Sequence, residues 1–260
     1  MQPLFEILEN VNTRIAAACQ RAGRDAKDVK LIAVTKTHGA EVVREAYAEG
    51  LRMIGENKVQ EAMFKKPECP SNLEWHLIGH LQSNKVRHAL MTFDYFHSID
   101  SIKLIDKLEQ CADEMGLRPK ILLEVNVSGE KSKSGMTIEE VPHVLEHVLM
   151  HCPRIQVEGF MTMAPFSPKA EDARPYFHRL KELQVSMRKA SGLFLGELSM
   201  GMSGDFEVAI EEGATFIRLG TILFGERPKL KRVVNADEGI TLARGLDSFD
   251  GGGPTVKILD

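Results

Sequence analysis

The stretch TFIRLGTILFG, residues 215–225, is an apolar run that contains one arginine, Arg218, and a glycine two residues later. Its β-branched and aromatic residues, bounded by glycine, predict a buried strand over 215–220. Charged side chains are rarely buried without a partner or a function. Arg218 therefore needs a specific explanation at the end of this strand.

Seven similar apolar runs precede this strand and alternate with longer helical patterns, several of which end in glycine, as helices prefer. The eight strands are predicted at 30–36, 51–56, 74–79, 95–99, 120–127, 155–163, 196–200 and 215–220. Such alternation in a chain of 260 residues predicts a single parallel (β/α)8 barrel of the TIM type. A doubly wound open sheet is the alternative.

Two further segments flank the strands. Residues 1–23 have acidic residues within an apolar helical period, which predicts an extra N-terminal amphipathic helix rather than a signal peptide. With this helix, the barrel domain is predicted to span residues 1–228. Residues 229–260 are polar and rich in glycine, which predicts a loosely ordered C-terminal tail.

The composition excludes several classes of protein. A hydrophobic content of 43% with 27% charged residues is typical of an ordinary globular protein. The formal charge of −4 argues against a nucleic-acid partner, which would require a basic face. No apolar run is long enough to cross a membrane.

The metal-binding residue types give no metal site from their spacing. The four cysteines lie far apart in the sequence, which predicts reduced thiols in the cytoplasm and neither a disulfide framework nor a zinc site. His143, His147 and His151 would share one helix face, a geometry that can bind a transition metal. We interpret them as a solvated face, because no cysteine or carboxylate joins them at close spacing.

Two glycine-containing loops follow the seventh and eighth predicted strands, where this barrel commonly binds phosphate. Glycine lets backbone N–H groups approach an anion, and serine or threonine can donate a hydrogen bond. The predicted phosphate site consists of Gly201, Ser203, Gly204, Gly220 and Thr221. The alternative is that these are ordinary turn glycines. A nucleophile elbow is excluded, because Asp205 takes the place of its final glycine.

Lys36 ends the first predicted strand, LIAVTK, which barrel closure places beside the eighth. Its amine should therefore project into the same mouth as Arg218 and the phosphate loops. An amine beside a phosphate site suggests a Schiff base with a phosphorylated aldehyde. A solvated lysine at a strand end is the alternative.

Several longer motifs carry a family resemblance. They are LIAVTKTH (31–38), GENKVQEA (55–62), WHLIGHLQSNK (75–85), KSGM (133–136), GFMTMAP (159–165) and MGMSGDFEVAIEEGATFIRLGTILFG (200–225). Together they resemble the pyridoxal phosphate homeostasis proteins, whose fold is similar to the barrel domain of alanine racemase. The resemblance covers residues 2–228. His38 departs from the lysine or glutamine of many members, which leaves the cofactor assignment intact.

The resemblance implies that Lys36 carries pyridoxal 5'-phosphate (PLP) as an internal aldimine. It implies a cofactor-binding set and no catalytic residue. This set comprises Lys36, Asn57, Met202, Ser203, Gly204, Arg218, Gly220 and Thr221. In it Ser203, Gly204, Gly220 and Thr221 hold the phosphate, and Asn57 and Met202 line the cofactor.

The resemblance further implies that Arg218 faces the pyridine nitrogen. It would keep this nitrogen unprotonated, since two adjacent positive charges repel strongly in a buried site. The unprotonated ring is a poorer electron sink. The alternative is that Arg218 pairs with a carboxylate such as Glu207 or Glu211.

The expected function is intracellular PLP (vitamin B6) homeostasis without substantial turnover, by a monomer whose partners are PLP and PLP-dependent apoenzymes. The alternatives are a PLP-dependent racemase and a sugar-phosphate enzyme without a cofactor. A two-base racemase needs a second base opposite the lysine. In racemases with this barrel that base looks to come from a second domain, and 35 residues after Gly225 are too few to build one.

Overall fold

The structure is a computed structural model that describes residues 2–130, 133–225, 231–235, 239–243 and 257–258. The chain divides into a larger unit, Met1–Phe224, and a smaller one, Gly225–Asp260. All four cysteines are free thiols.

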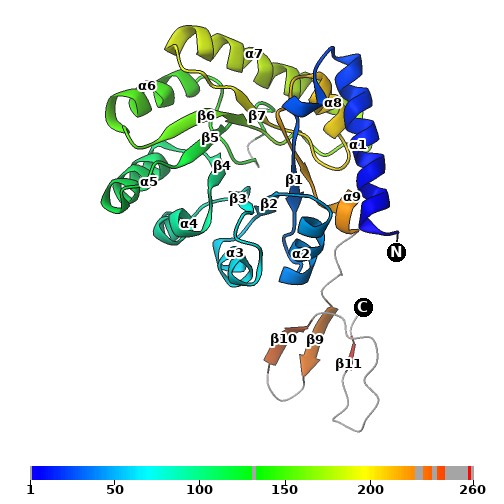
Figure 1. The fold of residues 1–260 in the computed structure, drawn as a ribbon. Coiled ribbons are helices and arrows are strands. Elements are labelled where there is room, and N and C mark those ends of the chain that lie inside the picture. Colours follow the sequence, from blue (N-terminus) through cyan, green and yellow to red (C-terminus); the bar gives the residue numbers. More distant parts are fainter. Residues whose placement is uncertain (1, 131–132, 226–230, 236–238, 244–256, 259–260) are drawn as a thin grey trace. The chain divides into compact units, whose positions relative to one another are not determined.

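Eight parallel strands close into a barrel in which each strand pairs with the next and the last pairs with the first (Figure 1). The strands are β1 (Lys30–Val34), β2 (Met53–Glu56), β3 (Glu74–Leu77), β4 (Tyr95–Ile99), β5 (Lys120–Glu124), β6 (Gln156–Met161), β7 (Glu197–Ser199) and β8 (Phe216–Leu219). This topology confirms the predicted (β/α)8 barrel and excludes the open sheet.

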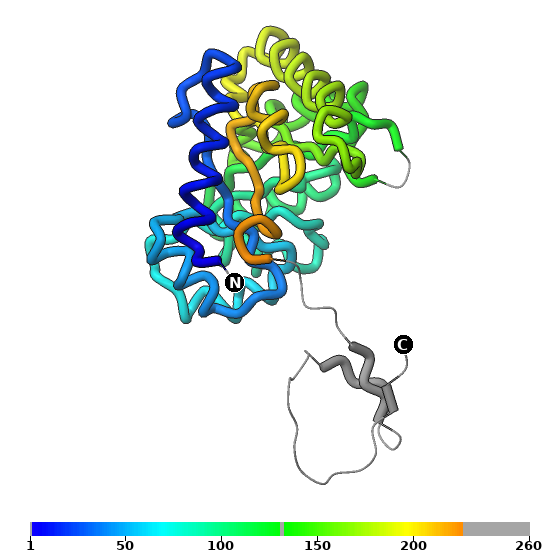
Figure 2. Tube along the Cα trace, turned by 90° about the vertical axis from the view of Figure 1, so that its right-hand side faces the viewer, coloured from blue at the N-terminus to red at the C-terminus, as the bar shows by residue number. Residues whose placement is uncertain are grey.

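Helices surround the barrel (Figure 1). They are α1 (Leu4–Arg21), α2 (Ala40–Ala48), α3 (Val59–Lys65), α4 (Val86–Thr92), α5 (Ile102–Met115), α6 (Val141–His151), α7 (Arg174–Ser191), α8 (Phe206–Glu211) and α9 (Thr221–Phe224). The predicted N-terminal helix is α1, which lies beside α8 in Figures 1 and 2. Arg21 Nε donates to Glu211 Oε1 at 2.6 Å and Arg14 bonds Glu207, so α1 is tied to α8.

The strands are shorter than the apolar runs that predict them. β1 ends at Val34, so the prediction that Lys36 ends the strand is wrong by two residues. Thr35 N still donates to Gly55 O at 3.1 Å, but Thr37 has a φ of +69° and turns the chain away from the ladder. Lys36 therefore lies in the turn that follows β1, at the carboxyl end of the barrel.

The alternation of side chains in β8 explains how an arginine fits into an apolar strand. Ile217 and Leu219 pack into the layer between strands and helices. Phe216 belongs to a separate buried cluster with Ile32, Tyr95, Leu122 and Met161, which come from five different strands and fill the barrel interior. Because side chains alternate along a strand, Arg218 points to the interior side with Phe216.

The smaller unit contains an antiparallel sheet in which β9 (Lys231–Asn235) lies between β10 (Gly239–Ala243) and β11 (Lys257–Ile258). Most of the segment predicted as a loosely ordered tail, 229–260, lies outside the described residues.

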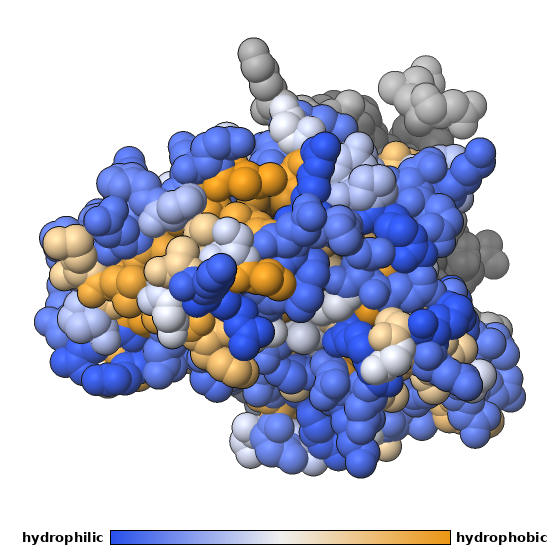
Figure 3. Space-filling model, turned by 90° about the horizontal axis from the view of Figure 1, so that it is seen from above, coloured by the Kyte–Doolittle hydropathy of each residue, from blue (hydrophilic) through white to orange (hydrophobic). Residues whose placement is uncertain are grey.

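The surface of the larger unit is mostly hydrophilic on the face in Figure 3, where apolar residues form a band between charged ones. Some of the exposed large apolar side chains are adjacent in one helix, as are Met63 and Phe64 on α3 and Leu149 and Met150 on α6. The exposed large apolar side chains also include Met91, Phe166 and Phe194. None of the helices in the described ranges combines the length and the apolar character that a membrane crossing requires.

Candidate functional site

The sequence-predicted site residues follow four strands that are neighbours in the closed barrel, in the order β7, β8, β1 and β2. Met202, Ser203 and Gly204 follow β7, and Gly220 and Thr221 follow β8. Lys36 follows β1, and Asn57 follows β2. Since all eight strands are parallel, these loops lie at one mouth of the barrel, where functional groups of this fold gather.

The loops after β7 and β8 are joined by hydrogen bonds. Ile222 N donates to Ser203 Oγ at 3.2 Å, and Arg218 N donates to Gly201 O at 3.0 Å. The two segments that were predicted to bind phosphate together are therefore in direct contact. Ser203 is half-buried and Thr221 is exposed, so both hydroxyls are accessible at the mouth.

Two glycines are required for the shape of these loops. Gly201 has a φ of +92°, and a Cβ there would lie 2.6 Å from Ala209 Cβ. A Cβ at Gly220 would lie 3.2 Å from Val34 O on β1, so the loop after β8 passes close to the end of β1. The positive φ and the close approach to Ala209 explain why glycine occupies position 201, and the tight contact with β1 favours glycine at position 220.

Asp205 fixes the start of α8. Its Oδ1 accepts a hydrogen bond from Met202 N at 2.6 Å. Burial raises the pKa of Asp205, and the hydrogen bond from Met202 N opposes the rise. Asp205, which rules out a nucleophile elbow, therefore holds the β7 loop in place. Met202 itself is 40% exposed.

Arg218 is 5% exposed and meets neutral acceptors. Its Nη1 donates to Ser199 Oγ at 2.6 Å and its Nη2 to Thr162 O at 3.0 Å. The alternative of a pair with Glu207 or Glu211 is wrong, because these carboxylates bond Arg14 and Arg21 on α1. In the described part of the chain, no carboxylate lies within ion-pair distance of the Arg218 guanidinium.

Burial lowers the pKa of Arg218 to about 10, and the charges of Asp205 and Glu124 oppose the change. The guanidinium is therefore still cationic at neutral pH. A buried cation without a carboxylate partner is suited to a site where a ligand supplies an acceptor.

A column of polar side chains runs from Arg218 into the barrel. Ser199 Oγ lies 2.8 Å from His97 Nδ1, and His97 Nε2 lies 2.9 Å from His76 Nδ1. His76 Nε2 lies 2.9 Å from Glu74 Oε1, but the ring N–H is not aligned for a hydrogen bond. Burial, followed by the charges of His76 and Arg218, lowers the pKa of His97 well below its usual value. His97 is therefore neutral and holds Ser199 beneath the guanidinium.

A second polar cluster fixes the chain just before Lys36. Thr35 Oγ1 donates to Glu56 Oε1 at 2.6 Å, and Lys65 Nζ donates to the same oxygen at 2.7 Å and to Thr35 O at 2.9 Å. Thr35, Glu56 and Lys65 are all buried. Because removing one member of a buried pair leaves an unpaired charge, this cluster resists movement and positions the turn that carries Lys36.

Glu124 is a titratable group at the mouth that the sequence patterns do not identify. It ends β5 and is 4% exposed. Burial and, second, the charge of Asp100 raise its pKa from 4.5 to about 7, while Arg218 opposes the rise.

This pKa predicts a pH-dependent loss of stability in PLP-free protein. Because the Glu124 carboxyl keeps its proton to higher pH in the folded state than in the unfolded chain, its contribution is fully present below pH 4.5 and is lost as the pH rises through about 7. We therefore compare the free energy of unfolding of Glu124→Gln with that of wild type at each pH. The difference should favour the variant at pH 8 by up to about 3 kcal/mol more than at pH 4.5. Urea unfolding of both proteins at the two pH values measures this, and a pH-independent difference would contradict it.

Comparison with known proteins adds to this geometry. The family model of the alanine racemase N-terminal domain matches residues 8–228. The pyridoxal phosphate homeostasis protein of Aquifex aeolicus is 45% identical over 224 residues, which cover 85% of this chain and 97% of that protein. The human protein of the same name is 37% identical over 240 residues, covering 86% and 87%.

Solved structures show the same relationship. PipY of Synechococcus elongatus with PLP bound is 39% identical, with a TM-score of 0.71, and the match covers 83% of this chain and all of PipY. An alanine racemase of Clostridium difficile has a TM-score of 0.66 at 15% identity, covering 87% of this chain and 57% of the racemase. The second similarity concerns the fold alone.

Proposed function

The chain belongs to the pyridoxal phosphate homeostasis proteins, which share the alanine racemase N-terminal domain, and we propose that it binds PLP at the barrel mouth and serves PLP homeostasis. The observation that carries the proposal is that the β7 and β8 loops are in contact and the β8 loop passes close to the end of β1, two residues before Lys36. The Arg218 side chain is buried between the same strands. PipY, with PLP bound, supports the same ligand.

The residues present at the mouth fit PLP. The phosphate needs N–H and hydroxyl donors without obstructing side chains, and Ser203, Gly204, Gly220 and Thr221 supply them. No atom lies within 4 Å of the position that a Cβ on Gly204 would take, so there is open space at this loop. The pyridine nitrogen needs a donor, and Arg218 is a cation without a carboxylate partner in the described residues.

Each of these side chains has a defined task in binding. The Lys36 amine would form the covalent link to the PLP aldehyde, a role that lysine amines have with carbonyl compounds. Ser203 and Thr221 would donate to the phosphate, and Asn57 and Met202 would border the ring. Arg218, held by Ser199 and Thr162, would donate to the ring nitrogen, and its charge would disfavour a proton there.

The same arrangement disfavours catalysis. When bound, PLP supplies an electron sink, and an unprotonated ring is a weaker one. Racemisation by two bases also needs an acid or base opposite the lysine. The Tyr95 hydroxyl is buried in the barrel interior, and burial raises its pKa. Tyr47, on α2, has the Arg52 guanidinium over its ring. Neither hydroxyl lies at the mouth, which supports a carrier in which these tyrosines do not act as a base opposite Lys36. The carrier we propose acts as a monomer and releases PLP to apoenzymes.

Incubation of the PLP-loaded protein with L-alanine in deuterated water tests this proposal. We expect no exchange of the α-proton by NMR and no D-alanine by chiral chromatography, while an alanine racemase run in parallel gives both. Turnover near the enzyme median of about 10 s⁻¹ would establish the racemase alternative instead.

A further inference from the structure

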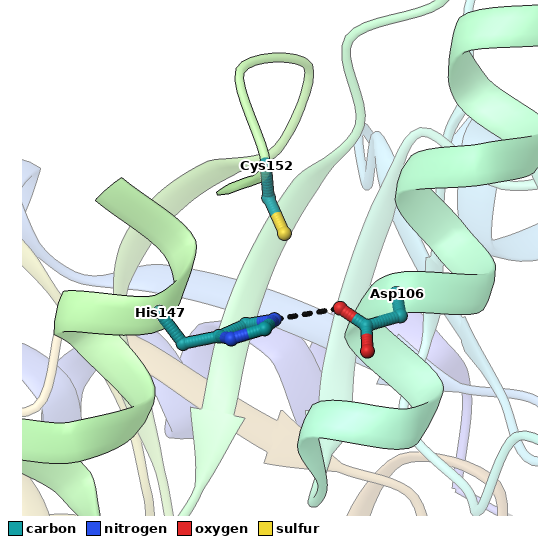
Figure 4. Close-up of side chains that lie close together, drawn as sticks. All are labelled: Asp106, His147 and Cys152. Atoms are coloured by element: carbon teal, nitrogen blue, oxygen red, sulfur yellow. Dashed lines mark hydrogen bonds and ion pairs between the residues drawn. The ribbon is translucent and has the colours of Figure 1, made fainter. Parts of the chain in front are cut away.

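Three potential metal ligands meet between α5 and α6, before the amino end of β6 and so at the opposite end of the barrel from the mouth (Figure 4). Asp106 comes from α5, His147 from α6, and Cys152 directly follows α6. One ligand atom from each lies within 4.8 Å of the other two. Neither the barrel mouth nor the proposed function uses these residues.

The side chains are directed at one point. His147 Nε2 lies 2.6 Å from Asp106 Oδ1, and Figure 4 shows the Cys152 thiol pointing toward this pair. Cys152 is 3% exposed, whereas the Asp106 side chain is 53% exposed. The group is therefore closed on the thiol side and open to an ion from solvent on the carboxylate side.

The chain around Cys152 is held rigidly against α5. The Glu109 carboxylate accepts hydrogen bonds from Arg154 N at 3.0 Å and Ile155 N at 3.2 Å. The Arg154 side chain donates to Asp113 Oδ1 at 3.0 Å. The loop that carries the thiol is thus fixed to the same helix that carries Asp106.

We propose that Asp106, His147 and Cys152 form a binding site for a divalent transition-metal ion of the zinc type. A thiolate, an imidazole and one carboxylate are ligands that zinc accepts and that magnesium and calcium do not prefer as a set. With bonds of about 2.0 to 2.3 Å, the ligand atoms of a tetrahedral ion are about 3.3 to 3.8 Å apart. The observed separations lie on both sides of this range, because His147 Nε2 and Asp106 Oδ1 are 2.6 Å apart and all three atoms lie within 4.8 Å of one another.

The ion replaces two protons. One is the proton between His147 and Asp106, and the other is the thiol proton, which passes to solvent. Asp106 and Glu109, both on α5, place two carboxylates beside the loop that carries Cys152. The same two carboxylates attract a dication.

The fourth position of the ion is available to His151 or to water. The His151 ring lies 4.9 Å from the His147 ring between centroids, whereas His143 is exposed one turn earlier on α6. The three histidines of the predicted solvated face therefore differ in their surroundings. His143 is exposed, whereas Asp106 on α5 and Cys152 in the loop after α6 lie close to His147.

Cobalt(II) is a direct probe of such a site, because a thiolate ligand gives a charge-transfer band in the near ultraviolet. We expect untagged, chelator-treated, PLP-loaded protein to develop this band at about one cobalt per chain. Zinc should displace the cobalt. Cys152→Ser should abolish the band, and His147→Gln should weaken cobalt binding at least about tenfold. Cys111→Ser, a buried cysteine on α5 outside the group, is the matched control and should change neither.

Absence of the band in wild type would overturn the proposal, as would its persistence in Cys152→Ser or an equal loss in Cys111→Ser. If Cys152→Ser does not fold, His147→Gln decides, because that side chain lies near the surface and its replacement leaves the thiol in place. Unchanged cobalt affinity in folded His147→Gln would then exclude the site. PLP binding is measured on the same samples by absorbance, so failure of the metal site is distinguishable from failure of the proposed function.

Discussion

Replacing Lys36 with alanine is expected to abolish covalent retention of PLP. Wild-type protein should purify yellow and keep about one PLP per chain through gel filtration, because the amine links to the aldehyde. The variant should lose its visible absorbance under the same conditions. The buried Thr35–Glu56–Lys65 cluster is left intact, so the variant should remain folded.

Lys58→Ala is the matched control for this change. Lys58 lies beside Asn57 in the loop after β2, its side chain is 72% exposed, and it pairs only loosely with Glu61 at 3.7 Å. The control should retain PLP as wild type does. Loss of the cofactor from Lys58→Ala and retention by Lys36→Ala would transfer the covalent link to the β2 loop.

The double variant Ser203→Ala, Thr221→Ala should bind PLP at least about tenfold more weakly than wild type. In the proposed site each hydroxyl would donate to a charged phosphate, and such hydrogen bonds contribute about 1.5 to 3 kcal/mol each. Affinity for unphosphorylated pyridoxal should barely change, because the two residues do not contact the ring. Equilibrium titration with both ligands, followed by absorbance, measures the difference.

Thr13→Ala, an exposed hydroxyl on α1 that bonds Glu9 O, controls for removal of a hydroxyl far from the mouth. Ser203 also accepts a hydrogen bond from Ile222 N, so thermal unfolding is recorded for each variant. An equal loss of affinity for PLP and pyridoxal would show that the two loops do not bind the phosphate.

The sequence was sufficient for the fold because each strand is an apolar run that is locally recognisable. The same regularity identified Arg218, since a single cation in an apolar strand is conspicuous. The prediction for Lys36 was less accurate. The apolar run LIAVT continues past Val34, where β1 ends, and Thr37 then turns the chain. Boundaries of strands depend on the loop geometry, which composition does not encode.

Other parts of the site depend on contacts between distant strands. His97 and Ser199 are 102 residues apart and meet because the barrel register places both in its interior. Glu124 gains its raised pKa from burial and from Asp100, neither of which is visible in its own strand. Likewise, Asp106 lies 41 residues before His147, and the packing of α5 on α6 brings them together. The spacing of these residues along the chain does not predict such long-range contacts.

The most direct test of the account is the location of the covalent link in wild-type protein. The PLP-loaded protein is reduced with borohydride, digested, and the modified peptide is identified by mass spectrometry. The account predicts that the label is on Lys36, in the turn after β1. A label on Lys58 or Lys85 instead would contradict it.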